Sequence, residues 1–443
     1  AVSDIEERDP ASVRSLTGLV RDQVGTCRLC KIIDVIFHRF GWQDMTPSTP
    51  IMNPTQPRKS PPAGFALWQL GFRPFYLAAS AFACVSVALW AMQYVGWLSW
   101  AYLPSPIWHA HELLFGYALA VVVGFLFTAG RNWSGQPTPA GRGLMALVLL
   151  WAAGRVLVAS PWPLVSALVN AAFPLAAAIG LARALVAARN RRNYFFVGLL
   201  GLLAVGQLGM HLSMMGAVEL PAVMGLRLGL DGLLLTMAVM GGRVIPMFTH
   251  NALPHARARR LAWLERIALG ALWGLMAIDL MPWQGTGAAI ALALVACVHL
   301  LRLLLWQPWK TVGTPLLWVL HVGYLWIPVH LALRALHELG LVSAQLATHA
   351  LTVGAIGGLT IGMMTRTALG HTGRPLRAGN WELGAYLAIF GAALVRVGGP
   401  LAWPAAYGAT VWLAALLWCV GFSCYLVGYL PILTRPRVDG RPG

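Results

Sequence analysis

The sequence predicts an all-α integral membrane protein with twelve transmembrane helices and both termini in the cytoplasm. Its 443 residues are 58% hydrophobic and only 11% charged, and the mean hydropathy is +0.67. Soluble domains are about 45–50% apolar and about 25% charged. This composition therefore excludes a soluble enzyme, a disordered chain and a nucleic-acid-binding domain. Two further observations set the number and direction of the helices: regularly spaced apolar runs, and loops that alternate in charge.

The apolar runs begin after residue 66 and recur, with short polar breaks, as far as residue 430. A helix that crosses a bilayer needs about 20 mostly apolar residues, and each run is close to that length. The predicted spans are 72–97, 107–129, 142–159, 162–186, 194–216, 227–250, 261–281, 285–306, 316–338, 343–366, 381–399 and 404–430.

The loops between these spans alternate in charge, which predicts the side on which each loop lies. Every loop on one side carries Arg or Lys, from Arg58 and Lys59 before the first span to Arg435 and Arg437 after the last. Basic loops stay in the cytoplasm, so the net charge of +17 reflects membrane topology and not nucleic-acid binding. The loops on the other side contain no Lys or Arg; they are 98–106, 160–161, 217–226, 282–284, 339–342 and 400–403.

The chain divides into three parts. Residues 1–63 are polar, end in a proline-rich stretch and lack a long apolar run, which predicts a poorly ordered N-terminal extension. Met52 begins a short basic leader, so residues 1–51 are interpreted as an upstream extension or a wrongly assigned start. Residues 64–431 form the twelve-helix membrane domain, and residues 432–443 form a basic cytoplasmic tail.

Ionisable side chains inside the predicted spans are candidate functional residues, because each is costly to place in hydrocarbon. With a helical rise of about 1.5 Å per residue, His111, His211 and His349 lie roughly 8–10 Å outward of their helix midpoints. Glu112 and Asp231 fall close to the same level. Neutral imidazole binds iron, copper and zinc, so this level predicts a buried metal or haem site. The alternative is that the histidines only form hydrogen bonds between helices.

Helical geometry limits which of these side chains can act together. His109 and His111 are two positions apart, about 200° around a helix, so they face different partners. His109 shares a face with Glu112. His211 shares a face with Met214, and an imidazole with a thioether suits Cu(I), although methionine in a membrane helix more often only packs.

The ninth span carries a further polar face, made of His330, Arg334 and His337. Arg334 is placed to pair with a haem propionate or with its neighbour Glu338. The cysteines give a weaker signal. Cys84 and Cys419 fall inside apolar runs and are interpreted, with the other cysteines of the spans, as small hydrophobic core residues.

Several motifs, in order along the chain, resemble the NnrS family. The resemblance covers about residues 64–431. The segments that carry it are 68–74, 108–116, 124–129, 132–135, 242–246, 248–249, 349–354, 364–366 and 369–375. It implies a twelve-helix protein of the bacterial inner membrane that contains haem and copper and serves the nitric oxide response, often alongside denitrification.

A more remote resemblance is to the catalytic subunits of haem-copper oxidases and nitric oxide reductases, which hold a haem between histidines of helices two and ten. His111 and His349 occupy those helices here. The copper ligands of those enzymes lie on helices six and seven, whereas the seventh span here has no histidine. The resemblance therefore extends to the bundle and the haem, and not to a binuclear centre.

These considerations give one set of predicted sites. His111 and His349 are the predicted axial ligands of a b-type haem. The predicted copper ligands are His109 and His211, with His330, His337 or Met214 in addition. Glu112 and Asp231 are predicted to orient the ligand imidazoles, and Arg227 or Arg334 to hold the haem propionates.

Two other functions fit the same residues. The first is a cofactor-free transporter of a small metabolite or metal complex, in which the polar level lines a substrate site. The second is a nitric oxide sensor or binding protein without turnover. The electron donor of an enzyme would be a further protein that the sequence does not identify.

Overall fold

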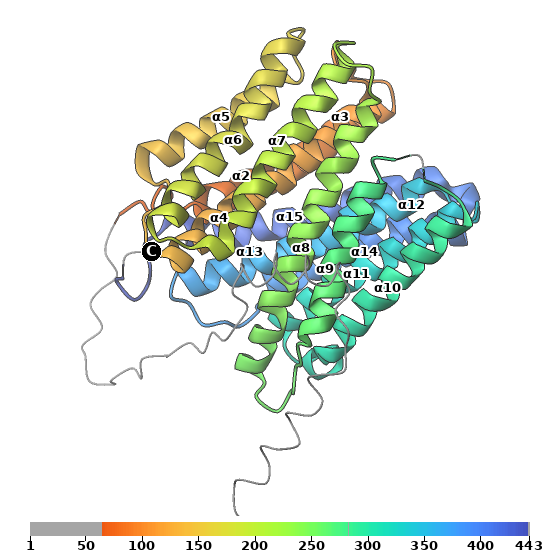
Figure 1. Ribbon diagram of the computed structural model, residues 1–443. Helices are drawn as coiled ribbons and strands as arrows, with labels where there is room; N and C mark the ends of the chain where they lie inside the picture. The colour runs from red at the N-terminus through yellow and green to blue at the C-terminus, as the bar shows by residue number, and fades with distance from the viewer. Residues whose placement is uncertain (1–63, 282, 442–443) are drawn as a thin grey trace, which may run out of the picture. The chain divides into compact units, whose positions relative to one another are not determined.

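The computed structural model describes residues 64–281 and 283–441, and across this part of the chain it contains helices and no strand (Figure 1). The predicted N-terminal extension lies outside the described residues. The predicted all-α class is confirmed, because each apolar run forms a helix that satisfies its own backbone hydrogen bonds, as hydrocarbon requires.

The first half of the membrane domain runs from residue 72 to residue 252. A π-helical turn, η2, joins α3 and α4 into one long span, Ser105–Ser134. The elements are α2 (Phe72–Tyr94), α3 (Ser105–His111), η2 (Glu112–Ala118), α4 (Leu119–Ser134), α5 (Gly141–Leu157), α6 (Pro163–Ala187), η3 (Arg191–Asn193), α7 (Tyr194–Met214) and α8 (Ala222–Ala252).

The second half follows the same pattern. A second π-helical turn, η5, joins α12 and α13 into the span Ala344–His371. The elements are α9 (Ala262–Ile278), α10 (Thr286–Leu305), η4 (Pro308–Thr311), α11 (Pro315–Glu338), α12 (Ala344–His349), η5 (Ala350–Gly357), α13 (Gly358–His371), α14 (Asn380–Ala402), η6 (Pro404–Ala406) and α15 (Tyr407–Thr434).

Ten helices of the described chain are long and apolar enough to cross a membrane. The two predicted spans that do not reach this length are 142–159 and 261–281, where α5 and α9 have 17 residues each. A helix of that length covers roughly 25 Å, against a hydrocarbon thickness of about 30 Å. The structure thus supports a multi-pass membrane protein, while the count of twelve spans and the cytoplasmic position of both termini stay predictions.

The centre of the bundle is made by the helices that carry most of the polar groups. Within the most apolar stretch of each span, 83% of the residues are buried in Ser105–Ser134, and 72% are buried in both Pro315–Glu338 and Ala344–His371. The same share is only 33% for the last span, which lies at the periphery. The central helix α8 packs against α7 on one side and against α9 and α11 on the other (Figure 1).

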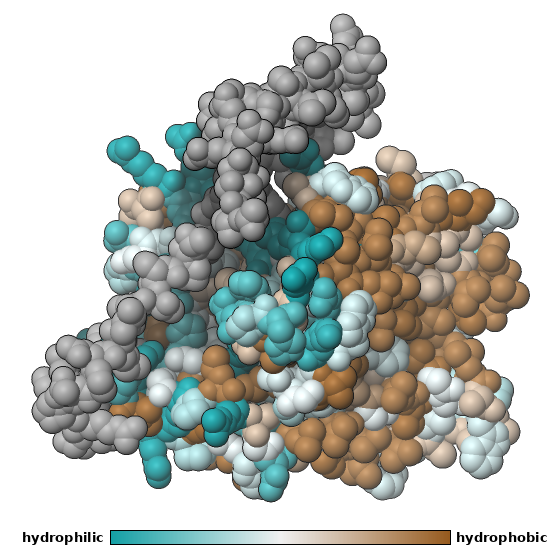
Figure 2. Space-filling model, turned by 90° about the horizontal axis from the view of Figure 1, so that it is seen from below, coloured by the Kyte–Doolittle hydropathy of each residue, from teal (hydrophilic) through white to brown (hydrophobic). Residues whose placement is uncertain are grey.

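The outside of the bundle is apolar. Large side chains such as Leu149, Val205 and Leu294 are more than 60% exposed, which is expected where the neighbour is lipid. Figure 2 shows apolar side chains covering a broad flank of the molecule, next to a polar region on the face seen from below.

Three arginines near the ends of predicted spans are buried in the bundle. Arg302 forms a two-pronged ion pair with Glu265, with Nε–Oε1 and Nη2–Oε2 distances of 2.7 and 2.6 Å, and donates to the Tyr324 hydroxyl. Arg73 donates to the carbonyls of residues 433 and 435 and so ties the start of α2 to the end of α15. Arg366 lies 4.0 Å from the centre of the Phe248 ring. These residues stabilise contacts between helices.

Candidate functional site

Two histidines from different helices meet inside the bundle. The Nε2 atoms of His111, at the end of α3, and His211, near the end of α7, are 3.2 Å apart. Their rings meet edge to face with centroids 4.9 Å apart, and both residues are fully buried. The structure therefore brings together two imidazoles that the sequence places at one level of the membrane.

The other ring nitrogen of each histidine is held by a protein group. The Nδ1 atom of His111 lies 2.7 Å from Oε1 of Glu112, and the Nδ1 atom of His211 lies 2.8 Å from the Tyr102 hydroxyl. Burial raises the pKa of Tyr102, in the loop before α3, to about 12, so this hydroxyl is protonated at neutral pH. It also reaches the carbonyl of His211 at 3.4 Å.

These contacts set the protonation of the pair. An ionised Glu112 only accepts hydrogen bonds, so the His111 Nδ1 carries the proton and the His111 Nε2 presents a lone pair. If Tyr102 donates to the carbonyl of His211, the same follows for the His211 Nε2. Two facing lone pairs repel unless a donor or a cation lies between them. This arrangement, with a carboxylate or hydroxyl behind each imidazole, is the usual support for a metal-ligating histidine.

A further layer of polar side chains supports the pair. Arg155 of α5 forms an ion pair with Glu112 at 2.5 Å and donates to the amide oxygen of Asn170. The amide nitrogen of Gln207 lies 3.1 Å from the His111 Nε2 and 3.3 Å from the Asn170 oxygen. Oε2 of Glu112 and Oε1 of Gln207 are buried without a hydrogen-bond partner. Two unpartnered acceptor oxygens beside two imidazoles are the environment that a cation would satisfy.

A second group of polar residues gathers around His109 and His349. His109 lies within electrostatic range of His349 and Arg396. The His109 ring stacks on Trp90 with centroids 4.3 Å apart, and its Nδ1 is buried without a partner. The His349 Nδ1 donates to the carbonyl of Gln345 at 2.7 Å, which leaves its Nε2 as the acceptor nitrogen.

Arg396 of α14 adds a cation to this second group. Its side chain is 7% exposed, its Nη2 donates to the Tyr407 hydroxyl at 3.2 Å, and its Nη1 is buried without a partner. A buried guanidinium with a free donor is suited to an anion such as a carboxylate.

His111 and His349 share a local feature of the backbone. Each is the last residue of a short α-helix and is followed at once by a π-helical turn, η2 or η5. Such turns occur frequently at functional sites. A π turn contains one residue more than an α-helical turn. The residues after it therefore do not lie on the helix faces that α-helical geometry predicts for them. In the structure Glu112 bonds to its neighbour His111, although α-helical geometry places Glu112 on the same face as His109.

The structure shows no direct contact between the two predicted haem ligands. Among the described residues His111 contacts Glu112, Phe115, Gln207 and His211. A haem held between His111 and His349 stays a prediction. The structure groups the four histidines as His111 with His211 and His109 with His349.

The other two histidines predicted as copper ligands, His330 and His337, have backbone partners. The His330 Nδ1 donates to the carbonyl of Ala347 at 2.7 Å and links α11 to α12. The His337 Nδ1 donates to the carbonyl of Val342 at 3.0 Å. Met214 is half-buried at the end of α7, one turn after His211.

The predicted propionate-binding arginines lie elsewhere. Arg334 forms an ion pair with Asp279 at 2.5 Å, and Arg227 is exposed. Asp231 interacts with Asp279 and Arg334, and no contact between Asp231 and an imidazole is found among the described residues. Two carboxylates were predicted to orient ligand imidazoles. In the described structure only Glu112 contacts an imidazole, that of His111.

Several residues of the two groups were missed by the sequence reasoning. Arg155, Asn170 and Gln207 are polar residues inside apolar runs, and that signal was available in the sequence. Arg396 carries the same signal, because it is an ionisable residue inside the predicted span 381–399. Tyr102 carries none, because it lies in a loop. In the residues described, no group of three or more His, Cys, Asp or Glu side chains is placed to hold one metal ion. Any ion at the His111–His211 pair would take further ligands from other groups.

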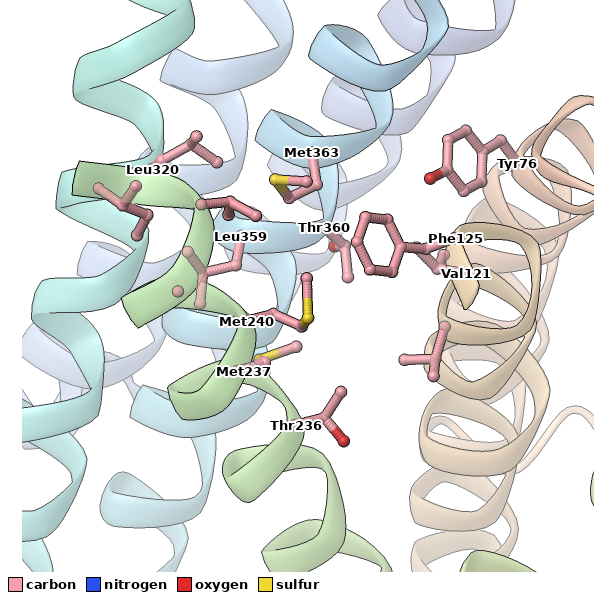
Figure 3. Close-up of a pocket in the computed structure, with 14 residues that line it drawn as sticks. Tyr76, Val121, Phe125, Thr236, Met237, Met240, Leu320, Leu359, Thr360 and Met363 are labelled. Carbon is pink, nitrogen blue, oxygen red and sulfur yellow. The ribbon is translucent and has the colours of Figure 1, made fainter. Parts of the chain in front are cut away.

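An apolar cavity of about 70 Å³ lies at the middle of the bundle between α4, α8 and α13. Figure 3 shows Met237, Met240 and Met363 around it, facing Phe125 and Thr360. Apolar cavities of this kind stay dry and take small apolar molecules. A charged metabolite would find no charged partner among its lining residues.

A family model described as NnrS protein matches residues 66–437. A search of curated protein sequences finds no match. Because the match covers most of the chain, including both histidine groups, the protein belongs to the NnrS family.

Proposed function

We propose that this protein is a haem- and copper-containing protein of a bacterial inner membrane that binds nitric oxide. NnrS membership supports a role in the nitric oxide response in general. The observation that carries the proposal is the presence of two histidine groups. In one the Nε2 atoms of His111 and His211 face each other, and in the other the Nδ1 atom of His109 is buried without a partner.

The haem is assigned to the group of His109, His349 and Arg396. A bis-histidine haem needs two neutral imidazoles in an apolar setting and a cation for its propionates. The unpartnered Nδ1 of His109 and the acceptor Nε2 of His349 meet the first need. The unpartnered Nη1 of Arg396 meets the second. This assignment keeps His349 from the sequence prediction and replaces His111 with His109.

Copper is assigned to His111 and His211. Their Nε2 atoms are 3.2 Å apart, which is close enough for both to reach one ion at a metal–nitrogen distance of about 2.0 Å. Imidazole is a preferred copper ligand, and Glu112 and Tyr102 fix the orientation of the two rings. Gln207 Oε1 and Glu112 Oε2, on two residues that contact His111, are acceptors without a partner.

Nitric oxide fits the remaining feature, the apolar cavity. It is small and uncharged and binds reduced haem iron and cuprous copper. Val121, at the cavity, follows His111 by ten residues in the same span, so the cavity lies roughly 15 Å deeper in the membrane than the histidine pair. The cavity would concentrate the gas beside the central helices.

The test is to purify the wild type and four variants in detergent. The variants are His109→Ala, His349→Ala, His111→Ala and His211→Ala, with His321→Ala as a matched control. His321 is also a buried histidine, but it bonds to the carbonyl of Leu317 within its own helix. Reduced-minus-oxidised spectra report haem, and elemental analysis reports copper.

We expect the haem spectrum to disappear in the His109 and His349 variants, and copper to fall in the His111 and His211 variants. The control should keep both. Loss of haem in the His111 variant with retention in the His109 variant would restore the original pairing. A wild type without a Soret band after growth with added haem would overturn the proposal. Rapid mixing of nitric oxide with reduced protein then separates binding, which stops at one equivalent per site, from turnover.

A further inference from the structure

Two cysteines from opposite ends of the chain meet near the middle of the membrane. Cys84 of α2 and Cys419 of α15 are 335 positions apart, and the Cys84 thiol donates to the carbonyl of Cys419 at 3.5 Å. The Cys419 thiol donates in return to the carbonyl of Cys84 at 3.8 Å. Each residue is close to the midpoint of its span.

Neighbouring contacts hold the two helices together at this point. The indole nitrogen of Trp418 donates to the carbonyl of Ala83 at 3.2 Å, and the Ser423 hydroxyl lies 3.7 Å from the Cys84 sulfur. A disulfide requires two cysteines whose backbones are close and whose side chains point at the opposite helix. The reciprocal contacts of the two sulfurs with the opposite carbonyls meet this requirement.

The pair differs from the other cysteines that the structure describes. Both members, like Cys424, are half-buried at the surface of the bundle, where lipid-soluble reagents reach them. Each member of the pair also contacts the backbone carbonyl of the other. Cys297 of α10 lies at a similar depth and is exposed, but no thiol faces it in the described residues. Cys297 is therefore a natural reference for the reactivity of a single thiol in the bilayer.

We propose that Cys84 and Cys419 are a redox-active dithiol that is oxidised to an inter-helix disulfide by nitrosating agents formed from nitric oxide. The source of the oxidant rests on the proposed function, whereas the pairing rests on the geometry alone. Nitric oxide and dioxygen are both apolar and form dinitrogen trioxide where they dissolve together, which includes the hydrocarbon of the membrane.

The chemistry balances in two steps. Dinitrogen trioxide transfers its nitrosyl group to one sulfur, forming a sulfur–nitrogen bond, and the thiol proton leaves with nitrite as nitrous acid. The second sulfur then attacks the first, so that the sulfur–sulfur bond forms and the sulfur–nitrogen bond breaks. The leaving group takes the second thiol proton and departs as nitroxyl. The two thiols are oxidised by two electrons, and the nitrosyl nitrogen is reduced by two.

The test uses the full chain in proteoliposomes, exposed to nitric oxide with dioxygen or, in a second arm, to diamide. Diamide is an uncharged thiol oxidant that contains no nitrogen oxide. Remaining thiols are alkylated with N-ethylmaleimide, and the peptides are identified by mass spectrometry. The peptide masses separate this pair from Cys27 and Cys30, the two cysteines of the N-terminal extension. Haem spectra are recorded on the same samples.

We expect labelling to be lost at both Cys84 and Cys419, with a linked peptide lighter by two hydrogen atoms, while Cys297 stays alkylated. In Cys84→Ser, Cys419 should form no linked peptide. Labelling of the pair equal to that of Cys297 in both arms would overturn the proposal. A link formed by diamide but not by nitric oxide with dioxygen would overturn the nitrosative assignment. Because the haem spectrum is read separately, failure of the proposed cofactor site gives a different result.

Discussion

The Nε2 atoms of His111 and His211 lie 3.2 Å apart, although the two residues are 100 positions apart in the chain. Each ring is fixed from behind, one by Glu112 and the other by Tyr102. The contact exists because α3 and α7 both pack into the centre of the bundle, so that two buried imidazoles take each other as neighbours. The first prediction follows from this support.

Glu112→Gln should weaken copper binding without removing either imidazole. The amide cannot take the negative charge that holds the His111 ring in one tautomer, and losing such a partner typically costs 10–100-fold in metal affinity. Copper titration with a competing chelator measures the change. Glu338→Gln is the matched control, since Glu338 accepts from the backbone amide of Gly285 and contacts no imidazole among the described residues. An unchanged affinity in Glu112→Gln would argue against the pair as a copper site.

Arg396→Gln should lower haem occupancy and leave copper unchanged, because its unpartnered Nη1 is the donor assigned to a propionate. The ratio of haem absorbance to protein measures occupancy, and Arg396→Lys should retain part of it. Arg334→Gln is the control. It breaks the ion pair with Asp279 and so lowers thermal stability, but it should keep haem at the wild-type ratio. Equal haem loss in the two variants would point to a general structural effect.

Glu265→Gln should destabilise the bundle strongly while leaving both cofactor groups intact. Removal of its charge leaves Arg302, which is 1% exposed, without its ion-pair partner. Breaking a buried ion pair from one side costs about 3–5 kcal/mol. Thermal unfolding in detergent gives the difference, and the exposed Lys310→Ala serves as control. A midpoint equal to that of the wild type would show that the pair contributes little to stability.

Gly225→Ala should separate α7 from α8 and so disturb His211. A Cβ at Gly225 would clash with the backbone carbonyl of Gly206 and lie 2.7 Å from the Met210 amide nitrogen, and backbone atoms cannot move aside cheaply. The expected cost is about 1–3 kcal/mol, with copper reduced. Gly209→Ala, on α7 next to His211, meets nothing within 4 Å and should behave as the wild type in both assays. Normal copper in Gly225→Ala would mean that the site tolerates movement of α7.

The C-terminal tail should undock in acid. Arg437 donates to the carbonyl of His371 at 2.8 Å and pairs with Asp439, and this pairing lowers the pKa of Asp439 from 3.8 to about 2. The undocked carboxyl protonates first as the pH falls, so the stabilisation is complete above about pH 4 and is lost between about pH 4 and 2. Hydrogen exchange at the Val438 amide, which bonds to the Thr372 carbonyl, should accelerate over that range. In Asp439→Asn the exchange rate should be fast at every pH. If the wild-type exchange rate at the Val438 amide changed with pH only as the intrinsic rate of an unprotected amide does, undocking of the tail by acid would be contradicted.

The sequence by itself determined the class of the protein and the level of its polar groups. Apolar runs of spanning length predict helices because hydrocarbon leaves the backbone no other partner. Depth also follows from the sequence, because the rise along a helix is nearly constant. His111 and His211 were placed at one level in this way, and in the structure their Nε2 atoms lie 3.2 Å apart. The NnrS resemblance, carried by short motifs in order, is confirmed.

Only the tertiary structure decided which groups are partners at that level. Direction around a helix depends on the local winding, and the π turn after His111 shifts the following residues away from their α-helical faces. Neighbours on other helices depend on packing, which depth does not encode. For this reason His111 pairs with His211, Arg334 with Asp279 and Cys84 with Cys419. The number of residues along a helix determines how deep a side chain lies in the membrane. Packing between helices determines which side chains touch at that depth.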